Sequence, residues 1–447
     1  MIQKRWLRII PVALIMYTIS YVDRTNVSLA LDPHISSLMK DLFMDDRMKG
    51  QVAGIFFLGY VFLQMPGGYF ASRWSPRKLV AIFLVLWGLA AAGCGLVTNF
   101  HQFAIMRFTL GMAESGVYPT TLVLLANWFP RAERARASAY WNLCQPLAVA
   151  GSAPITGWLL TVDWNHFSGL QNLWSHWSSK PLAGWQAMLI IEGCLPFIWV
   201  LIWLYFIRDH PRESKAISVE ERDYIENALK REAEELEPPI NTPVWHFFLK
   251  PTVFVMIAIC FLYNCAAYGC NAFLTEGLHD PSHSFTGLQT GLLFAVPYVV
   301  TAVFMVVNSW HSDKTGERRF HVAAVLSMSG AALIASVLMR PHSFWLSYAF
   351  LCFAIPGPFA TLALFWAIPI ETMPRVAAGA VIGLVNALGN TGGYFGSDIV
   401  GRLKMLTHGI TVPFSVLGTG LLVAAALCSL LPKGAGLIQS RTARPKI

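Results

Sequence analysis

The stretch LVAIFLVLWGLAAAGCGLVTN, residues 79–99, carries no charged side chain. A helix needs about 20 apolar residues to cross the hydrocarbon core of a bilayer. Similar apolar runs cover residues 184–207 and 412–431. Of the 447 residues, 55% are hydrophobic and only 13% are charged, whereas a soluble domain averages about 25% charged residues. The composition excludes a soluble globular enzyme and predicts a polytopic helical membrane protein.

Turn residues and charge clusters divide the sequence into twelve candidate membrane spans. They fall near residues 7–30, 48–71, 79–98, 101–127, 137–161, 185–207, 251–275, 287–308, 320–339, 343–367, 377–400 and 411–432. We therefore predict an all-α membrane protein with twelve transmembrane helices in two pseudo-symmetric six-helix bundles.

The basic residues predict the orientation. With an even number of spans, 24 of the 33 Lys and Arg residues lie on the side of the termini, 7 lie in the opposite loops and 2 lie inside spans. Loops rich in Lys and Arg stay in the cytoplasm. Both termini are therefore expected to be cytoplasmic, with an uncleaved first helix.

The longest hydrophilic stretch separates the sixth span from the seventh. It contains one soluble helix, for which Ser218 and Glu221 form a capping box. We expect four segments: an N-terminal bundle, a cytoplasmic linker with this helix, a C-terminal bundle and a cytoplasmic tail, at residues 1–207, 208–248, 249–432 and 433–447.

An internal repeat supports two homologous halves. Residues 72–78 match residues 313–319 at an offset of 241 positions. The same offset pairs polar residues of corresponding helices: Gln145 with Asn386, and Asp23 with Asn264. One ungapped offset that fits three places favours a duplicated six-helix unit.

Four charged residues fall inside the first and fourth spans: Asp23, Arg24, Arg107 and Glu114. A charge at the centre of a bilayer helix costs about 2.5–3.5 kcal/mol, so such residues face a partner or a water-filled cavity. One interpretation is an ion pair that only locks helices together. The other is a site in which the arginines bind a carboxylate and the acids exchange protons. The four charges cancel, so an entering organic anion adds a negative charge that protonation relieves.

Uncharged polar and aromatic side chains are expected to complete this site. Taken alone, each is explained as well by a helix–helix hydrogen bond or by packing. The repeat raises Gln145 and Asn386 above that background because it relates them to each other. The candidates for substrate contact are Tyr21, Tyr60, Gln145, Asn264, Tyr268, Trp366 and Asn386.

No pattern in the sequence favours catalysis or a cofactor. The eight cysteines lie in apolar stretches without metal-ligand spacing, and there is no phosphate-binding GxxxxGK[ST] loop. Asp313-Lys314-Thr315-Gly316 resembles the phosphorylated motif of ion-pumping ATPases, but the chain has no room for their large cytoplasmic domains. We expect no catalytic residue, metal or cofactor, and no nucleic-acid partner.

The chain resembles the major facilitator superfamily over its whole length. The resemblance rests on the twelve spans, the central linker and the signature loops at residues 68–78 and 308–319. It implies gating roles for Arg73, Arg77, Asp313, Gly316 and Arg318. In the first loop Ser72 and Ser75 replace the acid and glycine of the signature, which puts the usual gating salt bridge of that half in question.

Within the superfamily the sequence is most similar to the anion:cation symporter family. The similarity rests on five strings: Tyr21 to Asn26, Gln64 to Gly68, Arg107 to Pro119, Asn127 to Ala135, and Gly184 to Gly193. It implies proton coupling by Asp23 and Glu114, carboxylate binding by Arg24 and Arg107, and hydroxyl binding by Gln145 and Asn386.

Trp366 matches a tryptophan of the same family. Ala363 and Phe365 replace the small hydroxylated residues that often accompany it, which favours a flatter or smaller acid than a sugar acid.

The expected function is proton-coupled import of a small organic carboxylate by a monomer in the inner membrane. Its partners are then the acid, protons and membrane lipid. The alternatives are an exchanger or uniporter of organic anions without proton coupling, and a non-transporting receptor with the same fold.

Overall fold

The structure, a computed structural model, describes residues 4–142, 144–176, 178–214, 216–234, 245–279, 284–373 and 375–432. These residues form helices joined by turns and loops. Among them, nine helices are long and apolar enough to cross a membrane, and one bent pair of helices would make ten. The chain is an all-helical, multi-pass membrane protein.

The helices follow the twelve predicted spans. In order they are α1 (Lys4–Ala30), α3 with α4 (Asp46–Phe62, Gln64–Arg73), α5 (Pro76–Cys94), α6 with α7 (Phe100–Ser115, Val117–Trp128), α8 with α9 (Arg131–Asn142, Cys144–Thr161), α11 (Gly184–Phe206), α14 (Pro251–Gly277), α15 (Gly287–Thr315), α16 (Arg319–Met339), α17 to α19 (Phe344–Ala354, Pro356–Ala360, Leu362–Thr372), α20 (Arg375–Thr407) and α21 (Thr411–Leu427). The short helices α2 (Leu38–Asp41), α10 (Ser168–Trp174) and α13 (Trp245–Phe248) lie outside these spans.

Two helices end later than the sequence predicted. Helix α15 continues to Thr315 and α20 to Thr407, seven residues beyond each predicted span. The apolar run marks the thickness of the hydrocarbon, but backbone hydrogen bonding carries a helix on through polar residues.

Prolines account for the interrupted spans. Pro66 has no backbone N–H, and its ring crowds the carbonyl of the preceding turn. The bend of 40° between α3 and α4 lies at this point. Pro119 follows the break between α6 and α7 in the same way, and Pro356 and Pro358 lie between α17 and α19.

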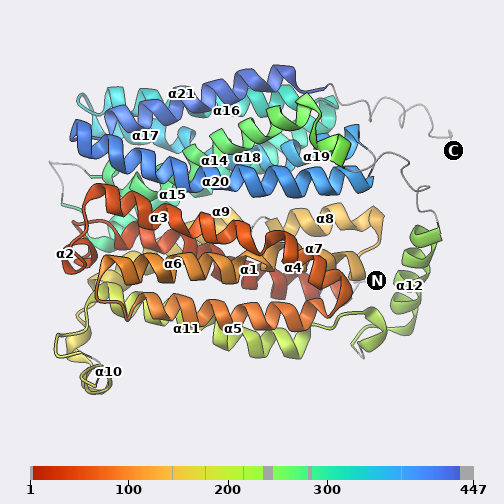
Figure 1. The fold of residues 1–447 in the computed structure, drawn as a ribbon, viewed down its shortest axis with the longest axis horizontal. Coiled ribbons are helices and arrows are strands. Elements are labelled where there is room, and N and C mark those ends of the chain that lie inside the picture. The colour runs from red at the N-terminus through yellow and green to blue at the C-terminus, as the bar shows by residue number, and fades with distance from the viewer. Residues whose placement is uncertain are drawn as a thin grey trace. The chain divides into compact units, whose positions relative to one another are not determined.

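The helices form two compact units. Unit 1 comprises Met1–Met44, Leu58–Pro239 and Thr286–Gly291. Within it α1 packs against α9 and α11, and α5 packs between α6 and α11. Unit 2 comprises Asp45–Phe57, Ile240–Phe285 and Leu292–Ile447. Its helices α14 and α20 run side by side, and α16 packs against α17 and α21 (Figure 1).

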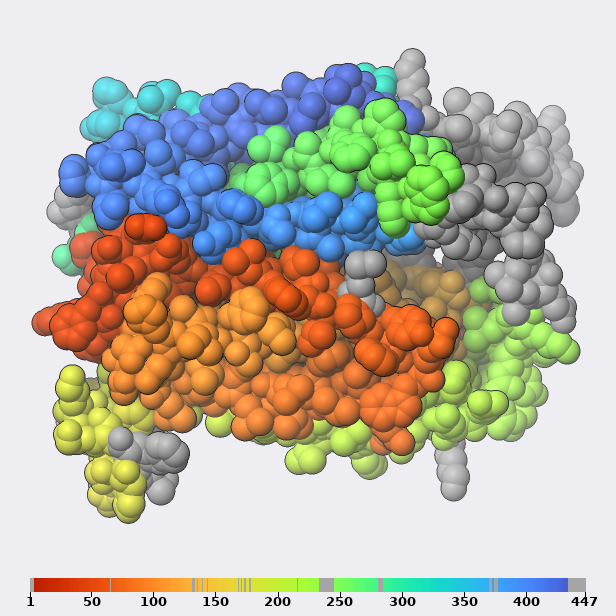
Figure 2. Space-filling model, viewed as in Figure 1, coloured from red at the N-terminus to blue at the C-terminus, as the bar shows by residue number. Residues whose placement is uncertain are grey.

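The surface of unit 1 is apolar where α5 and α6 face outward. These two helices form one continuous face in the space-filling view (Figure 2). On it Leu86, Leu89 and Ile105 are 49%, 59% and 61% exposed. A face of large exposed apolar side chains fits contact with lipid chains.

The linker helix α12 (Val219–Glu234) begins where the sequence predicted. The Ser218 hydroxyl oxygen accepts a hydrogen bond from the Glu221 amide at 3.2 Å, which confirms one half of the predicted capping box. The Glu221 carboxylate accepts a hydrogen bond from the Arg5 backbone amide at 3.3 Å. The predicted tail, residues 433–447, lies outside the described residues.

Helix α12 is attached to the rest of unit 1 by a buried arginine. Arg5 is fully buried and pairs with Glu133 of α8 at 2.5 Å. The Tyr224 hydroxyl of α12 donates to the same carboxylate at 3.0 Å. This hydrogen bond to Glu133 raises the pKa of Tyr224. The linker helix is thus held beside the start of α1 and of α8.

Candidate functional site

The centre of the site is an ion pair between α1 and α6. Arg24 Nε lies 2.9 Å from Glu114 Oε2, and the Ser20 hydroxyl donates to the same oxygen at 2.7 Å. Both charged side chains are buried, at 4% and 0% exposure. Helical spacing alone favours Arg107 as the partner of Glu114, because it lies seven residues before Glu114 on the same helix, whereas the structure pairs Glu114 with Arg24. The spacing of residues along one helix could not reveal a partner on another.

Aromatic rings surround the Arg24 guanidinium. Its central carbon lies 4.5 Å from the ring centroid of Tyr60, 5.0 Å from that of Tyr21 and 5.7 Å from that of Tyr17. Such rings attract a cation through their π faces and leave its N–H groups to act as donors. Tyr21 and Tyr60, both predicted from the sequence, are therefore neighbours of the predicted anion-binding arginine.

Asp23 lies on α1 beside a second arginine. Its carboxylate accepts a hydrogen bond from Trp87 Nε1 of α5 at 2.5 Å. Arg107 Nη1 donates to the backbone carbonyl of Asp23 at 3.1 Å. All three side chains are buried. The four charged residues singled out from the sequence thus lie together inside unit 1.

A third buried acid, Glu192 of α11, was overlooked as a candidate because it lies in a run read as apolar. It is 4% exposed. Its Oε2 accepts a hydrogen bond from Asn26 of α1, and its Oε1 accepts one from the Thr156 hydroxyl of α9 at 2.7 Å. The signal was present, since one carboxyl in a helix of otherwise uncharged residues needs an explanation. The sum of zero charge deduced from four residues was therefore wrong, because three acids and two arginines lie here.

Three acceptor atoms of this region have no hydrogen-bond partner among the described residues. They are Asn26 Oδ1, Glu114 Oε1 and Gln145 Oε1. Gln145 is 5% exposed, and its amide nitrogen donates to Asn142 Oδ1 at 3.0 Å. A buried polar atom without a partner costs about 1–3 kcal/mol, so water or a ligand hydroxyl is expected to satisfy it.

The candidates in the second half make neutral contacts. Asn264 of α14 donates to the Gly389 carbonyl of α20 at 3.2 Å. This is a helix–helix hydrogen bond, the alternative to substrate contact given above for such residues. Asn386 accepts from Asn390 at 3.3 Å. The Tyr268 ring centroid lies 3.9 Å from that of Phe57, and that of Trp366 lies 5.0 Å from that of Phe365. Tyr268, Trp366 and Asn386 are partly exposed.

In the first signature loop, Asp209 supplies a carboxylate that the loop itself lacks. Its Oδ2 accepts from the Ser75 hydroxyl at 2.5 Å, and its Oδ1 accepts from the Arg77 amide at 2.8 Å. Arg77 also donates to the Leu204 carbonyl at 2.5 Å, and Arg73 lies over the Tyr69 ring at 4.6 Å. An acid after α11 thus contacts Ser75, which replaces the glycine of the signature, and the backbone of Arg77.

The second signature loop keeps its internal ion pair. Arg318 Nη1 lies 2.5 Å from Asp313 Oδ1. Gly316 has φ of 71°, a left-handed conformation that costs glycine little and other residues more. The loop therefore turns tightly enough for its arginine to reach back to its aspartate.

A charge cluster that the sequence did not predict lies at the end of α14 in unit 2. Lys49 of α3, fully buried, lies 2.8 Å from Glu276 Oε1. Lys404 of α20 lies 2.6 Å from Glu276 Oε2 and 2.8 Å from Asp46 of α3. Two lysines and two acids from three helices balance one another, and we call them the Lys49 cluster.

The helices that carry the Lys49 cluster approach closely. A Cβ atom on Gly50 would lie 2.3 Å from the Ser397 carbonyl oxygen of α20. Only glycine fits that contact.

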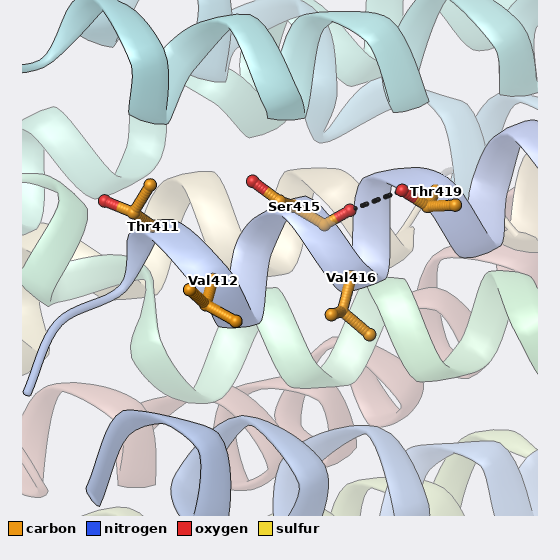
Figure 3. Close-up of a pocket in the computed structure, with 5 residues that line it drawn as sticks. All are labelled: Thr411, Val412, Ser415, Val416 and Thr419. Atoms are coloured by element: carbon orange, nitrogen blue, oxygen red, sulfur yellow. Dashed lines mark hydrogen bonds between the residues drawn. The ribbon is translucent and has the colours of Figure 1, made fainter. Parts of the chain in front are cut away.

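A hollow of about 330 Å³ with uncharged lining residues lies on α21. Its lining runs along one helix face: Thr411, Val412, Ser415, Val416 and Thr419 (Figure 3). Val412 and Val416 are 42% and 45% exposed, as expected for a lipid-facing stripe. No three His, Cys, Asp or Glu side chains of the described residues are grouped so as to hold a metal ion.

Comparisons with known proteins agree with this architecture. A family model described as Major Facilitator Superfamily matches residues 13–397. A putative tartrate transporter of Agrobacterium vitis is 28% identical over 99% of this chain and 94% of its own length. A quinolone resistance transporter of Acinetobacter baumannii is 27% identical over 90% of this chain and 87% of its own. A probable galactarate/D-glucarate transporter of Bacillus subtilis is 25% identical, with coverages of 96% and 92%.

Solved structures share the fold at low sequence identity. A bacterial homologue of the human lysosomal transporter Spinster, in an inward-facing and occupied conformation, superposes with a TM-score of 0.74 at 16% identity. The alignment covers 94% of this chain and 96% of that one. The likeness extends across both halves of the chain.

Proposed function

Because the chain belongs to the major facilitator superfamily, a family of secondary transporters and not of enzymes, we propose that it imports a small organic carboxylate together with protons. The names of two relatives support an organic acid as the substrate: one is a putative tartrate transporter and one is a probable galactarate/D-glucarate transporter. The charge pattern of the loops supports an inner-membrane protein with cytoplasmic termini.

The observation that carries the proposal is the buried Arg24–Glu114 pair. A guanidinium offers two parallel donors that match a carboxylate, and Arg24 is already paired with a carboxylate of the protein at 2.9 Å. A substrate carboxylate can replace Glu114 on this arginine only if Glu114 loses its charge. Protonation of Glu114 and binding of the anion therefore favour each other.

Reciprocity makes this exchange a coupling mechanism. If protonation tightens substrate binding, substrate binding tightens proton binding by the same factor. Asp23 precedes Arg24 in the chain, and Arg107 donates a hydrogen bond to its backbone carbonyl. Movement of either arginine therefore changes the surroundings of this second acid. We assign Glu114 to the substrate-linked proton and Asp23 to the gate-linked one.

Further contacts support the selection of substrate and the alternation of access. Gln145 Oε1 offers an acceptor to a substrate hydroxyl, and Asn386 is its repeat-related counterpart. The Lys49 cluster holds the first half of α3 to α14 and α20. In alternating access such contacts break and re-form on each cycle.

Transport by purified protein in liposomes tests the proposal. With tartrate as the probe, we expect an inward proton gradient to drive accumulation and a protonophore to abolish it. An exchanger would accumulate labelled tartrate only against internal tartrate. A receptor would bind tartrate, which a thermal shift detects, without moving it. Either result would refute proton-coupled import.

A further inference from the structure

We propose that Glu192 is a third proton-binding carboxyl of the transport cycle, which holds a proton in the conformation described here and exchanges it in concert with Asp23. The inference rests on the proton coupling proposed above. It adds a residue of the sixth span to a mechanism that the sequence placed in the first and fourth spans alone.

The surroundings of Glu192 lack a compensating charge. No Lys, Arg or His of the described residues lies within 4 Å of its carboxylate, and its two hydrogen-bond donors, Asn26 and Thr156, are neutral. Glu114, equally buried, has Arg24 at 2.9 Å. An ionised carboxylate buried without a counter-charge is strongly disfavoured, and such groups take up a proton instead.

Asn26 can serve Glu192 in either protonation state. Its amide nitrogen donates to Oε2, while its amide oxygen, buried, has no hydrogen-bond partner among the described residues. The two ends of an amide exchange by a half turn, and ordinary structures do not distinguish them. After the turn, the oxygen accepts the proton carried by Oε2, while Thr156 continues to donate to Oε1.

The helices packed on α11 bring one other acid to this place. From α1 comes Asp23, one turn before Asn26 and close enough for its charge to repel that of Glu192. From α5 comes the buried Cys94, and from α9 comes the neutral Thr156. Two acids that repel each other titrate as a pair in two steps. Trp87 and Arg107 contact Asp23 and not Glu192, so the shared proton is placed on Glu192.

Infrared spectroscopy of the purified protein in lipid, without substrate, tests this placement. A protonated carboxyl has its own carbonyl stretch, and a step to alkaline pH removes it. We expect a band that is lost in Glu192→Gln and kept in Glu226→Gln, a control on the exposed face of α12. A Glu192→Gln spectrum identical to that of the wild type would overturn the proposal.

Thr156→Val provides a test that does not depend on the folding of Glu192→Gln. The change keeps the side-chain shape and removes the hydrogen bond to Glu192 Oε1, so the carbonyl band should move to higher frequency. An unmoved band would also overturn the proposal.

Tartrate uptake then separates this inference from the proposed function. In wild-type liposomes we expect more protons per tartrate than in Glu192→Gln. An uncoupled wild type would refute the symporter and leave the infrared result to decide on Glu192. A coupled wild type with an unchanged ratio in the variant would refute only the role of Glu192.

Discussion

The two compact units bury different side chains. In unit 1 the interior holds five ionisable groups close together: Asp23, Arg24, Arg107, Glu114 and Glu192. In unit 2 the buried polar contacts are neutral, such as Asn264 to Gly389 and Asn271 to the Tyr298 hydroxyl at 2.6 Å. Its buried charges are paired elsewhere: Lys49 meets Glu276 at the end of α14, and Asp398 meets Arg402 within α20. The two units thus share a helical architecture but differ in the side chains that they bury, which are mainly charged at the site in unit 1 and mainly neutral in unit 2.

This difference suggests a division of labour. Charge inside a membrane is costly and is retained where protons or ions are handled, so coupling and carboxylate binding are assigned to the first half. Amides and aromatic rings distinguish the shape and hydroxyl pattern of a substrate. The second half is therefore assigned to recognition of the rest of the substrate. The following predictions test this assignment.

The largest effect is expected from Arg24→Ala. The change leaves Glu114 buried without its partner, which typically costs about 3–5 kcal/mol of stability, and removes the donor for the substrate carboxylate. Tartrate uptake and binding should both be lost, and Arg24→Lys should restore them only in part because an ammonium lacks the planar fork. Arg107→Ala should also abolish binding.

Arg212→Ala, at an exposed position, is the matched control for these variants and should behave like wild type. Near-normal affinity in either intramembrane variant would remove that arginine from the site.

Glu114→Gln should separate binding from coupling. Glutamine imitates the protonated acid, so tartrate binding and counterflow exchange should survive while accumulation driven by the proton gradient is lost. Both are measured in the same liposomes with and without internal tartrate. Gradient-driven accumulation by Glu114→Gln would transfer the coupling role to Asp23, and the same result for Asp23→Asn would leave neither acid as the carrier.

The sequence predicted the fold well because the length of a hydrophobic run is a local property. At the site it mainly missed partners on other helices. It identified Arg24 and Glu114 but not their pairing, and it missed the Lys49 cluster, which joins three helices. Glu192 was visible as a single acid, yet only its contacts with Asn26 and Thr156 give it significance.

Glu276→Gln tests the charges at the end of the second half. The change weakens the pairing of two lysines, one of them fully buried, and should lower the melting temperature in detergent. In the double variant Lys49→Met, Glu276→Gln, the pair of Lys404 with Asp46 remains and no unpaired buried lysine is left. The double variant should therefore regain most of the lost stability. A double variant less stable than Glu276→Gln alone would show that Lys49 stabilises through its packing on Phe273.

The smallest effect is expected from Asn386→Ala, and it tests the division between the halves most directly. Asn386 is partly exposed on α20 and is related by the repeat to Gln145. If it binds a substrate hydroxyl, its loss should matter for tartrate, less for malate and not for succinate, because these acids carry two, one and no hydroxyl groups. A hydrogen bond to an uncharged group contributes about 0.5–1.5 kcal/mol, so the preference for tartrate over succinate should fall by roughly two- to tenfold.

The pH dependence of uptake by Asn386→Ala should stay that of the wild type, since Asn386 does not titrate. Gln145→Ala is the matched variant in the first half and should show the same loss of hydroxyl preference. Should Asn386→Ala instead uncouple tartrate from the proton gradient, coupling would extend into the second half and the assignment drawn from the buried charges would be wrong.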